Sequence, residues 1–207
     1  MYCFSFVEDA PSAAVAKKLV EDRNSACSRK LILKDGFPKI MGGYGPIKTQ
    51  APAFLNMAKA GIYTFTITDL DTRPCASSLI REWFSLTHNQ PVTLPIEVLF
   101  RVAVREIESW LLADRAALAG FLGIHEQHFS AAPDDLPDPK QHLFSVLSQK
   151  GKKAFHREML PNPRGTANIG PRYNEIMCEF IEKKWSPSRA ATASPSLARA
   201  IAALRRI

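Results

Sequence analysis

Strand-like and helix-like segments alternate along the first half of this chain, and this alternation restricts the fold more than any other feature. Apolar and β-branched runs predict strands at residues 2–7, 30–33, 63–68 and 96–104. Segments with helical spacing of apolar residues lie between and after these strands. Strands joined through helices run parallel, because the chain must return before each new strand begins. We therefore predict an α/β fold with a mostly parallel four-stranded sheet flanked by helices.

Acidic residues come directly after every predicted strand: Glu8, Asp35, Asp69, Asp71, Glu106 and Glu108. The carboxyl ends of parallel strands lie along one edge of a sheet, where ligands bind in folds of this class. Each acid also precedes a predicted helix, so any one of them is compatible with a helix cap. Their shared position favours a common acidic site over a series of unrelated caps.

The segment Asp69-Leu70-Asp71, together with Glu8, indicates a metal site. Two carboxylates so close repel each other unless a cation lies between them, and Mg²⁺ (or Mn²⁺) prefers oxygen ligands. We expect Glu8, Asp69 and Asp71 to bind one ion and to be catalytic. Glu106 or Glu108 would assist, at a second ion of the kind that supports phosphodiester cleavage. The spacing does not choose between these two glutamates.

Asp69-Leu70-Asp71 is also similar to the Asp-x-Asp motif of aspartyl-phosphate hydrolases, whose first aspartate is a nucleophile. That motif has Thr or Val at its fifth place, where this chain has Arg73. It also usually follows the first strand, whereas here it follows the third. A phosphatase therefore ranks below a metal-dependent nuclease.

Charge divides the chain into two parts. Residues 1–139 carry 14 Lys and Arg against 16 Asp and Glu, whereas residues 140–207 carry 13 against 4. A basic second part suits the binding of a polyanion such as DNA or RNA, and a solvated basic surface is an equally simple explanation. The candidate nucleic-acid contacts are Lys140, Lys150, Lys152, Lys153, Arg157, Arg164 and Arg172. Phe155 and Tyr173 would offer rings for base stacking.

A stretch rich in Pro and Asp at residues 129–141 predicts a boundary. We expect an α/β domain over residues 1–128 and a helical, basic subdomain over residues 129–207. Helices are predicted there near residues 141–150, 172–184 and 196–206. The glycine-rich segment at residues 41–48 lacks the spacing of a phosphate-binding loop and is expected to be a flexible connector.

The four cysteines lie far apart in sequence and form no metal-binding pair, so we expect reduced and mostly buried thiols. No apolar run is long enough to cross a bilayer, and the first residues lack the pattern of a signal peptide. These features predict a soluble, cytoplasmic protein with no membrane partner.

Five segments resemble an uncharacterised bacterial family of TOPRIM-like proteins, a domain of unknown function: FVED, TDLD, RVAVREIESWLLADRAAL, GPRYNEIMCEFI and SPSLARAIAAL. The resemblance covers nearly the whole chain. The TOPRIM fold is shared by topoisomerases, primases and nucleases of the overcoming-lysogenisation-defect type. The resemblance implies a TOPRIM-like (Rossmann-like) domain and a metal site at Glu8, Asp69 and Asp71. The family often has Gly and a second acid after the glutamate, and here Asp9-Ala10-Pro11 departs from that pattern.

These observations lead to the hypothesis of a Mg²⁺-dependent nuclease that hydrolyses DNA or RNA phosphodiesters. Related TOPRIM proteins in phage defence act as nuclease partners of ATPases. This chain has no ATPase motif, so an ATPase partner would be a separate protein. The second hypothesis is a non-catalytic binding or regulatory subunit, in which the acids are structural.

Overall fold

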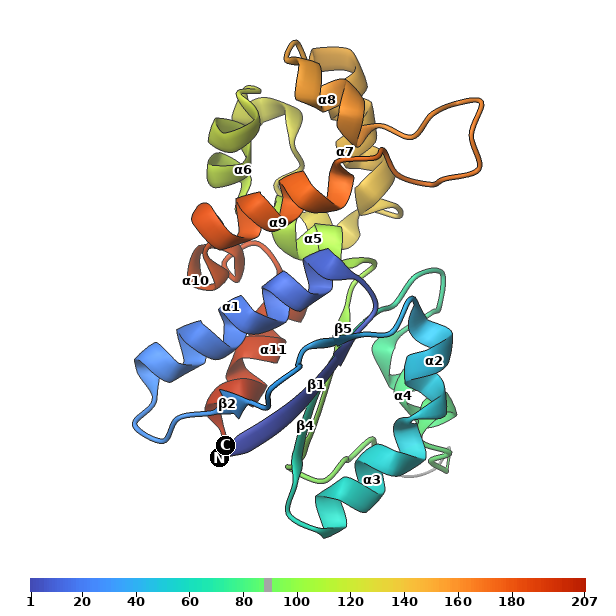
Figure 1. Cartoon of the computed structure of the whole chain (residues 1–207), viewed down its shortest axis with the longest axis vertical. Helices are drawn as coiled ribbons and strands as arrows, with labels where there is room; N and C mark the ends of the chain where they lie inside the picture. The colour runs from blue at the N-terminus through green and yellow to red at the C-terminus, as the bar shows by residue number, and fades with distance from the viewer. Residues whose placement is uncertain (88–90) are drawn as a thin grey trace.

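A parallel β-sheet forms the centre of the molecule in the computed structural model, which describes residues 1–87 and 91–207 (Figure 1). The strands are β1 (Tyr2–Val7), β2 (Ile32–Leu33), β3 (Lys39–Ile40), β4 (Tyr63–Asp69) and β5 (Val98–Ala103). Their order is β2-β1-β4-β5, with β3 also paired to β1, and every described pairing is parallel. The predicted α/β class with a mostly parallel sheet is confirmed.

The short strands β2 and β3 share one side of β1. β2 pairs with Tyr2 and Cys3 at the start of β1, and β3 pairs with Phe6 and Val7 at its end. The structure thus adds a fifth short strand to the four that were predicted. A two-residue strand has no periodicity for a sequence pattern to reveal.

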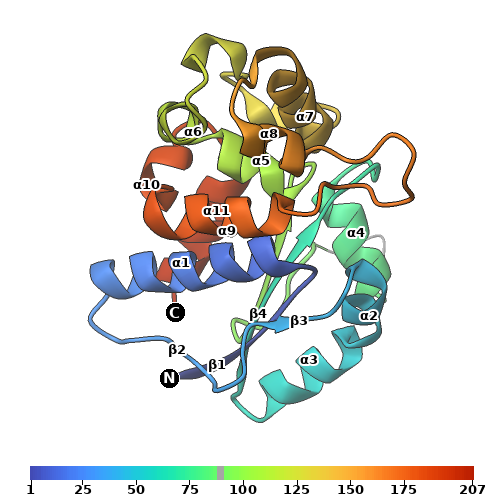
Figure 2. The same ribbon diagram turned by 45° about the horizontal axis from the view of Figure 1, so that its top comes forward.

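Helices cover both faces of the sheet (Figures 1 and 2). In the first half these are α1 (Ala10–Ala26) on one face and α2 (Tyr44–Thr49), α3 (Ala51–Lys59) and α4 (Ala76–Trp83) on the other, whereas α5 (Ile107–Leu112) and α6 (Arg115–Leu122) lie beyond the carboxyl ends of the strands. Alternation along β5 divides the core, because neighbouring side chains of a strand point to opposite faces. Leu99 and Ala103 belong to the cluster that contains α1, whereas Phe100 and Val102 belong to the cluster that contains α3 and α4.

The second half of the chain is helical. It contains two short 3₁₀ turns, η1 (Glu126–His128) and η2 (Pro133–Asp135), followed by α7 (Pro139–Lys150), α8 (Ala154–Met159), α9 (Tyr173–Lys183), α10 (Pro187–Ala190) and α11 (Pro195–Arg205). The three predicted helices correspond to α7, α9 and α11. The short helices α8 and α10 form in segments that were expected to be loops.

The glycine-rich segment at residues 41–48 is not the flexible connector that was expected. Gly42 and Gly43 have φ angles of 76° and 121°, which other residues rarely adopt, and they lead directly into α2. Ile47 of this helix is fully buried in the core beside α3. The buried isoleucine explains why a helix persists in a sequence rich in Gly and Pro.

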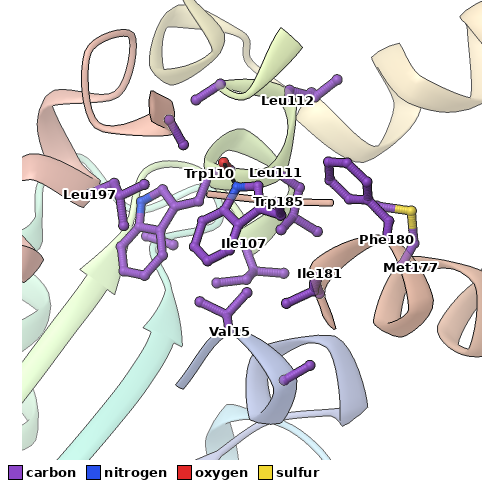
Figure 3. Close-up of a cluster of buried hydrophobic side chains, with 14 of the residues drawn as sticks. Val15, Ile107, Trp110, Leu111, Leu112, Met177, Phe180, Ile181, Trp185 and Leu197 are labelled. Carbon is purple, nitrogen blue, oxygen red and sulfur yellow. Dashed lines mark hydrogen bonds between the residues drawn. The ribbon is translucent and has the colours of Figure 1, made fainter. Parts of the chain in front are cut away.

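The core is continuous between the two halves of the chain. Trp110 of α5 and Trp185, which follows α9, are both buried in one cluster (Figure 3). Trp185 Nε1 donates a hydrogen bond to the Trp110 carbonyl at 3.0 Å, and Trp110 Nε1 donates to Ser196 Oγ at 2.7 Å. The two predicted domains therefore share a hydrophobic cluster, and the boundary at residue 128 stays a prediction.

The last helix covers the sheet beside α1. α11 packs on β5 and on α1, and the buried Arg23 of α1 connects these layers. Arg23 donates hydrogen bonds from Nε to the Leu204 carbonyl at 3.2 Å, and from Nη2 to the carbonyl of Ile207. A guanidinium is tolerated inside the fold here because backbone acceptors surround it.

The sequence predicts reduced, mostly buried thiols and no segment that crosses a membrane. All four cysteines are free; Cys3 is buried, whereas Cys75 is exposed. Within residues 1–87 and 91–207, no helix combines the length and the apolar character needed to span a bilayer.

Candidate acidic site

The carboxyl ends of β1, β4 and β5 bring the first acids together. Phe6 pairs with Thr66, and Asp69 pairs with Ala103, so the three strands leave the sheet at one edge. Glu8 Oε1 accepts hydrogen bonds from Thr68 Oγ1 at 2.6 Å and from the Asp69 N–H at 3.0 Å. The side chain that follows β1 is thereby attached to the end of β4.

Asp69 connects this edge to the start of α5. Its Oδ1 accepts a hydrogen bond from the Ile107 N–H at 2.8 Å, between the two glutamates that follow β5. Burial raises the pKa of Asp69 well above its usual value, and the carboxylates of Glu108 and Glu8 raise it further, against the Lys140 ammonium. Asp69 therefore lies at the centre of the acidic cluster, which we define as Glu8, Asp69, Asp71, Glu106 and Glu108.

Glu108 is the most buried acid of the cluster. Only 1% of its side chain is exposed, and its Oε1 accepts a hydrogen bond from the Tyr173 hydroxyl at 2.8 Å. The Lys140 ammonium lies 3.4 Å from the same oxygen. Burial raises the pKa of Glu108 to about 7, although Lys140 opposes the shift. The other oxygen, Oε2, is buried without a hydrogen-bond partner, which is costly for a carboxylate.

Glu106 faces the same lysine from the N-cap position of α5. Its backbone is extended there, and its Oε2 accepts a hydrogen bond from the Lys140 N–H at 3.0 Å. The Lys140 ammonium lies 3.7 Å from Glu106 Oε1. Burial raises the pKa of Glu106, against the effect of Lys140. The extended backbone explains how two glutamates two residues apart reach one cation.

Lys140 is the cation beside Glu106 and Glu108, whereas Arg73 Nη1 lies 3.8 Å from Asp71 Oδ2 at the other side of the acidic cluster. Lys140 lies in the first turn of α7, and about a quarter of its side chain, 26%, is exposed. Burial alone would lower its pKa, but the carboxylates of Glu108, Glu106 and Asp69 raise it overall. One ammonium thus serves several carboxylates, and the cluster keeps an excess of negative charge.

Asp71 lies at the open side of the cluster. Its φ of 51° is left-handed, a conformation that Asp tolerates better than most residues. The N–H groups of Leu70 and Asp71 both donate to the Arg105 carbonyl at 2.9 Å, which holds the turn against the end of β5. Asp71 lines a hollow of about 570 Å³ together with Thr72, Arg105, Asp134, Asp135 and Pro137. Of the acids in the cluster, Asp71 is the one that borders this hollow.

The acid after the second strand lies elsewhere. β2 pairs with the first residues of β1, so Asp35 leaves the sheet beside the middle of β1, before its carboxyl end. β3 takes the position next to the end of β1 instead. The expectation that every acid after a strand reaches one edge is wrong for Asp35, because its strand ends too early.

The chemistry of the cluster suits a divalent cation, although its side chains are not arranged as a complete ligand set. Among the described residues, no group of three or more His, Cys, Asp or Glu is positioned to hold a metal ion. All donors are hard oxygens, Glu108 Oε2 has no partner, and burial, followed by repulsion between carboxylates, raises the pKa values of Glu8 and Asp69. Binding Mg²⁺ would require the carboxylates to turn toward the ion.

Sequence reasoning missed several groups around the acids. Thr68 and Tyr173 hold Glu8 and Glu108, and Asp9 caps α1 by accepting a hydrogen bond from the Ser12 N–H at 2.9 Å. Tyr173 was expected to stack on bases, but it is only 1% exposed and cannot do so. Of these three residues, only Asp9 has a role that the local sequence could have predicted, because Asp followed by Ala-Pro is typical of the start of a helix.

The predicted nucleic-acid contacts fall into two groups. Lys140 is engaged by the acidic cluster, and Arg172 pairs with Glu158 and Glu175, each at 2.7 Å. The other five are exposed and make no ion pair with a described residue: Lys150, Lys152, Lys153, Arg157 and Arg164. These five, at the end of α7, in the connection to α8, on α8 and in the loop after it, are called the basic surface below.

Comparison of the chain with known protein families, with curated proteins and with solved structures finds no match.

Proposed function

We propose that this protein is a Mg²⁺-dependent, TOPRIM-like nuclease that hydrolyses phosphodiesters of DNA or RNA. The observation that carries the proposal is the position of Asp69, which lies among the carboxylates of Glu8 and Glu108 at the carboxyl edge of the sheet. Such crowding of acids is unfavourable unless a cation or a function compensates for it. Hard oxygen donors make Mg²⁺ the fitting cation.

The acids of the cluster would have different roles, which depend on the contacts that each side chain makes. Asp69 and Asp71 would hold the ion, and Glu8 would join them or act as general base through the oxygen that does not accept from Thr68. A bound Mg²⁺ would polarise the phosphoryl group and stabilise its developing charge. Lys140 would add positive charge beside the same phosphate, and Glu106 and Glu108 would position Lys140.

The basic surface would hold the nucleic-acid backbone. Its five side chains have no acidic partner in the described part of the chain, so their charges are available to phosphates. The proposal includes a separate ATPase as partner, a role in phage defence and a cytoplasmic location, which free thiols suit.

The decisive experiment is a cleavage assay on single-stranded and duplex DNA and RNA with Mg²⁺ or Mn²⁺. Asp69→Asn keeps the shape of the side chain and removes one charge, so we expect cleavage to fall at least about a hundredfold. Glu8→Gln should have a similar effect. Asp35→Asn is the matched control, because it removes an acid after a strand that does not reach the cluster, and it should leave cleavage unchanged.

The outcome also separates the nuclease from the phosphatase. In a phosphatase Asp69→Asn would remove the nucleophile, and Glu8→Gln would matter little. Cleavage that persists in both Asp69→Asn and Glu8→Gln would disprove the assignment of the acidic cluster. Because the proposal includes a partner ATPase, metal binding is measured independently of turnover: millimolar Mg²⁺ or Mn²⁺ should raise the melting temperature of the wild type and not of Asp69→Asn.

One observation favours the second candidate, a non-catalytic binding or regulatory subunit. The Lys140 ammonium already neutralises part of the charge on Glu106 and Glu108. If the cluster is structural, neither Mg²⁺ nor Mn²⁺ will shift the melting temperature, and nucleic acid will bind without being cut. Saturable metal binding that Asp69→Asn removes would rule this candidate out.

A further inference from the structure

A second hollow, of about 690 Å³, opens beside β5 at the free edge of the sheet. β5 has a neighbouring strand on one side only, and the hollow occupies space on its other side, between α4 and α11. Residues 92–96 complete its wall. None of the five acids of the acidic cluster lines it, so it is a separate feature of the molecule.

Three arginines line this hollow, which we call the arginine hollow. Arg199 lies on α11, Arg206 follows seven residues later as the C-cap of that helix, and Arg101 comes from β5. No Asp or Glu is among the described residues of its lining. Within residues 1–87 and 91–207, none of the three guanidinium groups makes an ion pair or a hydrogen bond with a protein group.

Arg101 has the most buried side chain of the three arginines. Its side chain is half-buried, and its Nε is buried without any hydrogen-bond partner. Burial lowers the pKa of Arg101, and the nearby positive charge of Arg206 lowers it further. Arginine cannot relieve this repulsion by releasing its proton at physiological pH, so the charge of Arg101 persists beside that of Arg206.

The rest of the lining is mainly apolar. Ile80, Leu94 and Ile96 contribute to the walls, and Ile96 is unusually exposed for an isoleucine, at 56%. A ligand for this hollow thus needs an anionic end for the guanidinium groups and a less polar part for these side chains. The volume lies in the range of small-molecule sites.

We propose that the arginine hollow binds a phosphate-bearing small molecule with an apolar or aromatic portion, the class to which nucleotides belong. The planar donor fork of arginine matches the oxygens of a phosphate, and three such groups around one hollow exceed what a single carboxylate would satisfy. The bound phosphate would supply the negative charge that the described lining of the hollow lacks. This site is independent of the nuclease proposed above.

The test is calorimetric titration of the full chain, without divalent metal, with inorganic pyrophosphate and with adenosine 5′-diphosphate as probes. We expect saturable binding of both, with the nucleotide tighter because its base contacts the apolar wall. Arg101→Gln should weaken both probes at least about tenfold, since it removes charge-assisted hydrogen bonds. Ile96→Ser should weaken only the nucleotide. Arg29→Gln is the matched control, because Arg29 is exposed and does not line the hollow.

The melting temperature of each variant checks its fold. Arg101→Gln should melt no lower than the wild type when no ligand is present, because Arg101 has no protein partner to lose. The proposal fails if neither probe binds the wild type with a dissociation constant below about a millimolar, or if Arg101→Gln binds both as tightly as the wild type. Binding of citrate as tightly as pyrophosphate would also overturn the proposal, since the hollow would then show no preference for phosphate over carboxylate.

Discussion

The acidic cluster and the arginine hollow both gather charge of one sign, but they differ in what balances that charge. The acidic cluster has an internal cation, Lys140, and acids that take up protons more readily because they are buried, as the raised pKa of Glu108 indicates. The arginine hollow has no acid among the described residues of its lining, and arginine stays protonated. The cluster therefore has groups within the protein that reduce its charge, whereas the described lining of the hollow offers none.

The largest expected effect comes from removing the internal cation. Lys140→Met leaves Glu106 and Glu108 half-buried or buried without their partner, so we expect a loss of about 3–5 kcal/mol in the free energy of unfolding at pH 8. Urea denaturation measures the loss. Lys152→Met, on the basic surface, is the control and should change stability by less than about 0.5 kcal/mol. Equal stability of the two variants would show that the cluster does not depend on Lys140.

The pH dependence of stability is the next largest effect. Burial raises the pKa of Glu108 from 4.5 to about 7, so the folded state binds more protons than the unfolded state between these values. Stability is therefore greatest below pH 4.5 as far as this group is concerned, and it falls as the pH rises to 7, by up to about 3 kcal/mol. Glu8 and Glu106 shift in the same direction.

Glu108→Gln checks the pH effect, because the amide cannot ionise and can still accept from Tyr173. Denaturation midpoints measured from pH 4.5 to 8 should decline less steeply in this variant than in the wild type. Glu126→Gln, which alters an exposed acid paired with Arg115, serves as control and should keep the wild-type slope. Parallel curves for wild type and Glu108→Gln would contradict the raised pKa.

A smaller effect of opposite sign is expected at the arginine hollow. Arg101→Met removes a half-buried charge that has no protein partner, so the ligand-free protein should gain up to about 1 kcal/mol in stability. Pyrophosphate should then raise the melting temperature of the wild type and not of the variant. A marked loss of stability in Arg101→Met would mean that its aliphatic stem or its charge supports the fold, and the contrast with Lys140 would disappear.

The smallest stability effect is expected where charges of one sign are fully solvated. Changing Lys150, Lys152 and Lys153 together to Glu should alter unfolding by less than about 0.5 kcal/mol per site, since none has an ion-pair partner in the described structure. Nucleic-acid binding should nevertheless weaken for all sequences, and the slope of log affinity against log salt should fall by about 3. Lys59→Glu, on α3, is the control. Unchanged binding of the triple variant would make the basic surface a solvated face only.

The sequence revealed the sheet because its longer strands are apolar runs with helices between them. It did not reveal β3, whose two residues, Lys39 and Ile40, are exposed and show no pattern. It also placed a loop where Ile47 anchors α2 in the core. Such short elements are stabilised by tertiary contacts more than by local preference, so a local pattern cannot show them.

The convergence of Glu8 and Asp69 followed from parallel topology alone, since both residues end neighbouring strands. The partners of Glu108 could not be predicted in this way, because Lys140 and Tyr173 reach it from α7 and from α9. Lys140 was grouped with the basic residues around it, since sequence gives its charge and not its neighbours. Only the three-dimensional structure shows that two residues of the basic half, Lys140 and Tyr173, contact an acid of the cluster.

The closure of the sheet by α11 has a consequence for the order in which the protein is synthesised. The first helix is made early, and its buried Arg23 has acceptors nearby at Asn24 and Arg29, but the acceptor of its Nε is Leu204, 181 residues later in the sequence. Until the last helix has left the ribosome, one face of β5 and of α1 has no cover. The nascent chain therefore exposes apolar surface until α11 has been made, and the contacts of α11 with α1 close over a very long sequence separation, which slows folding.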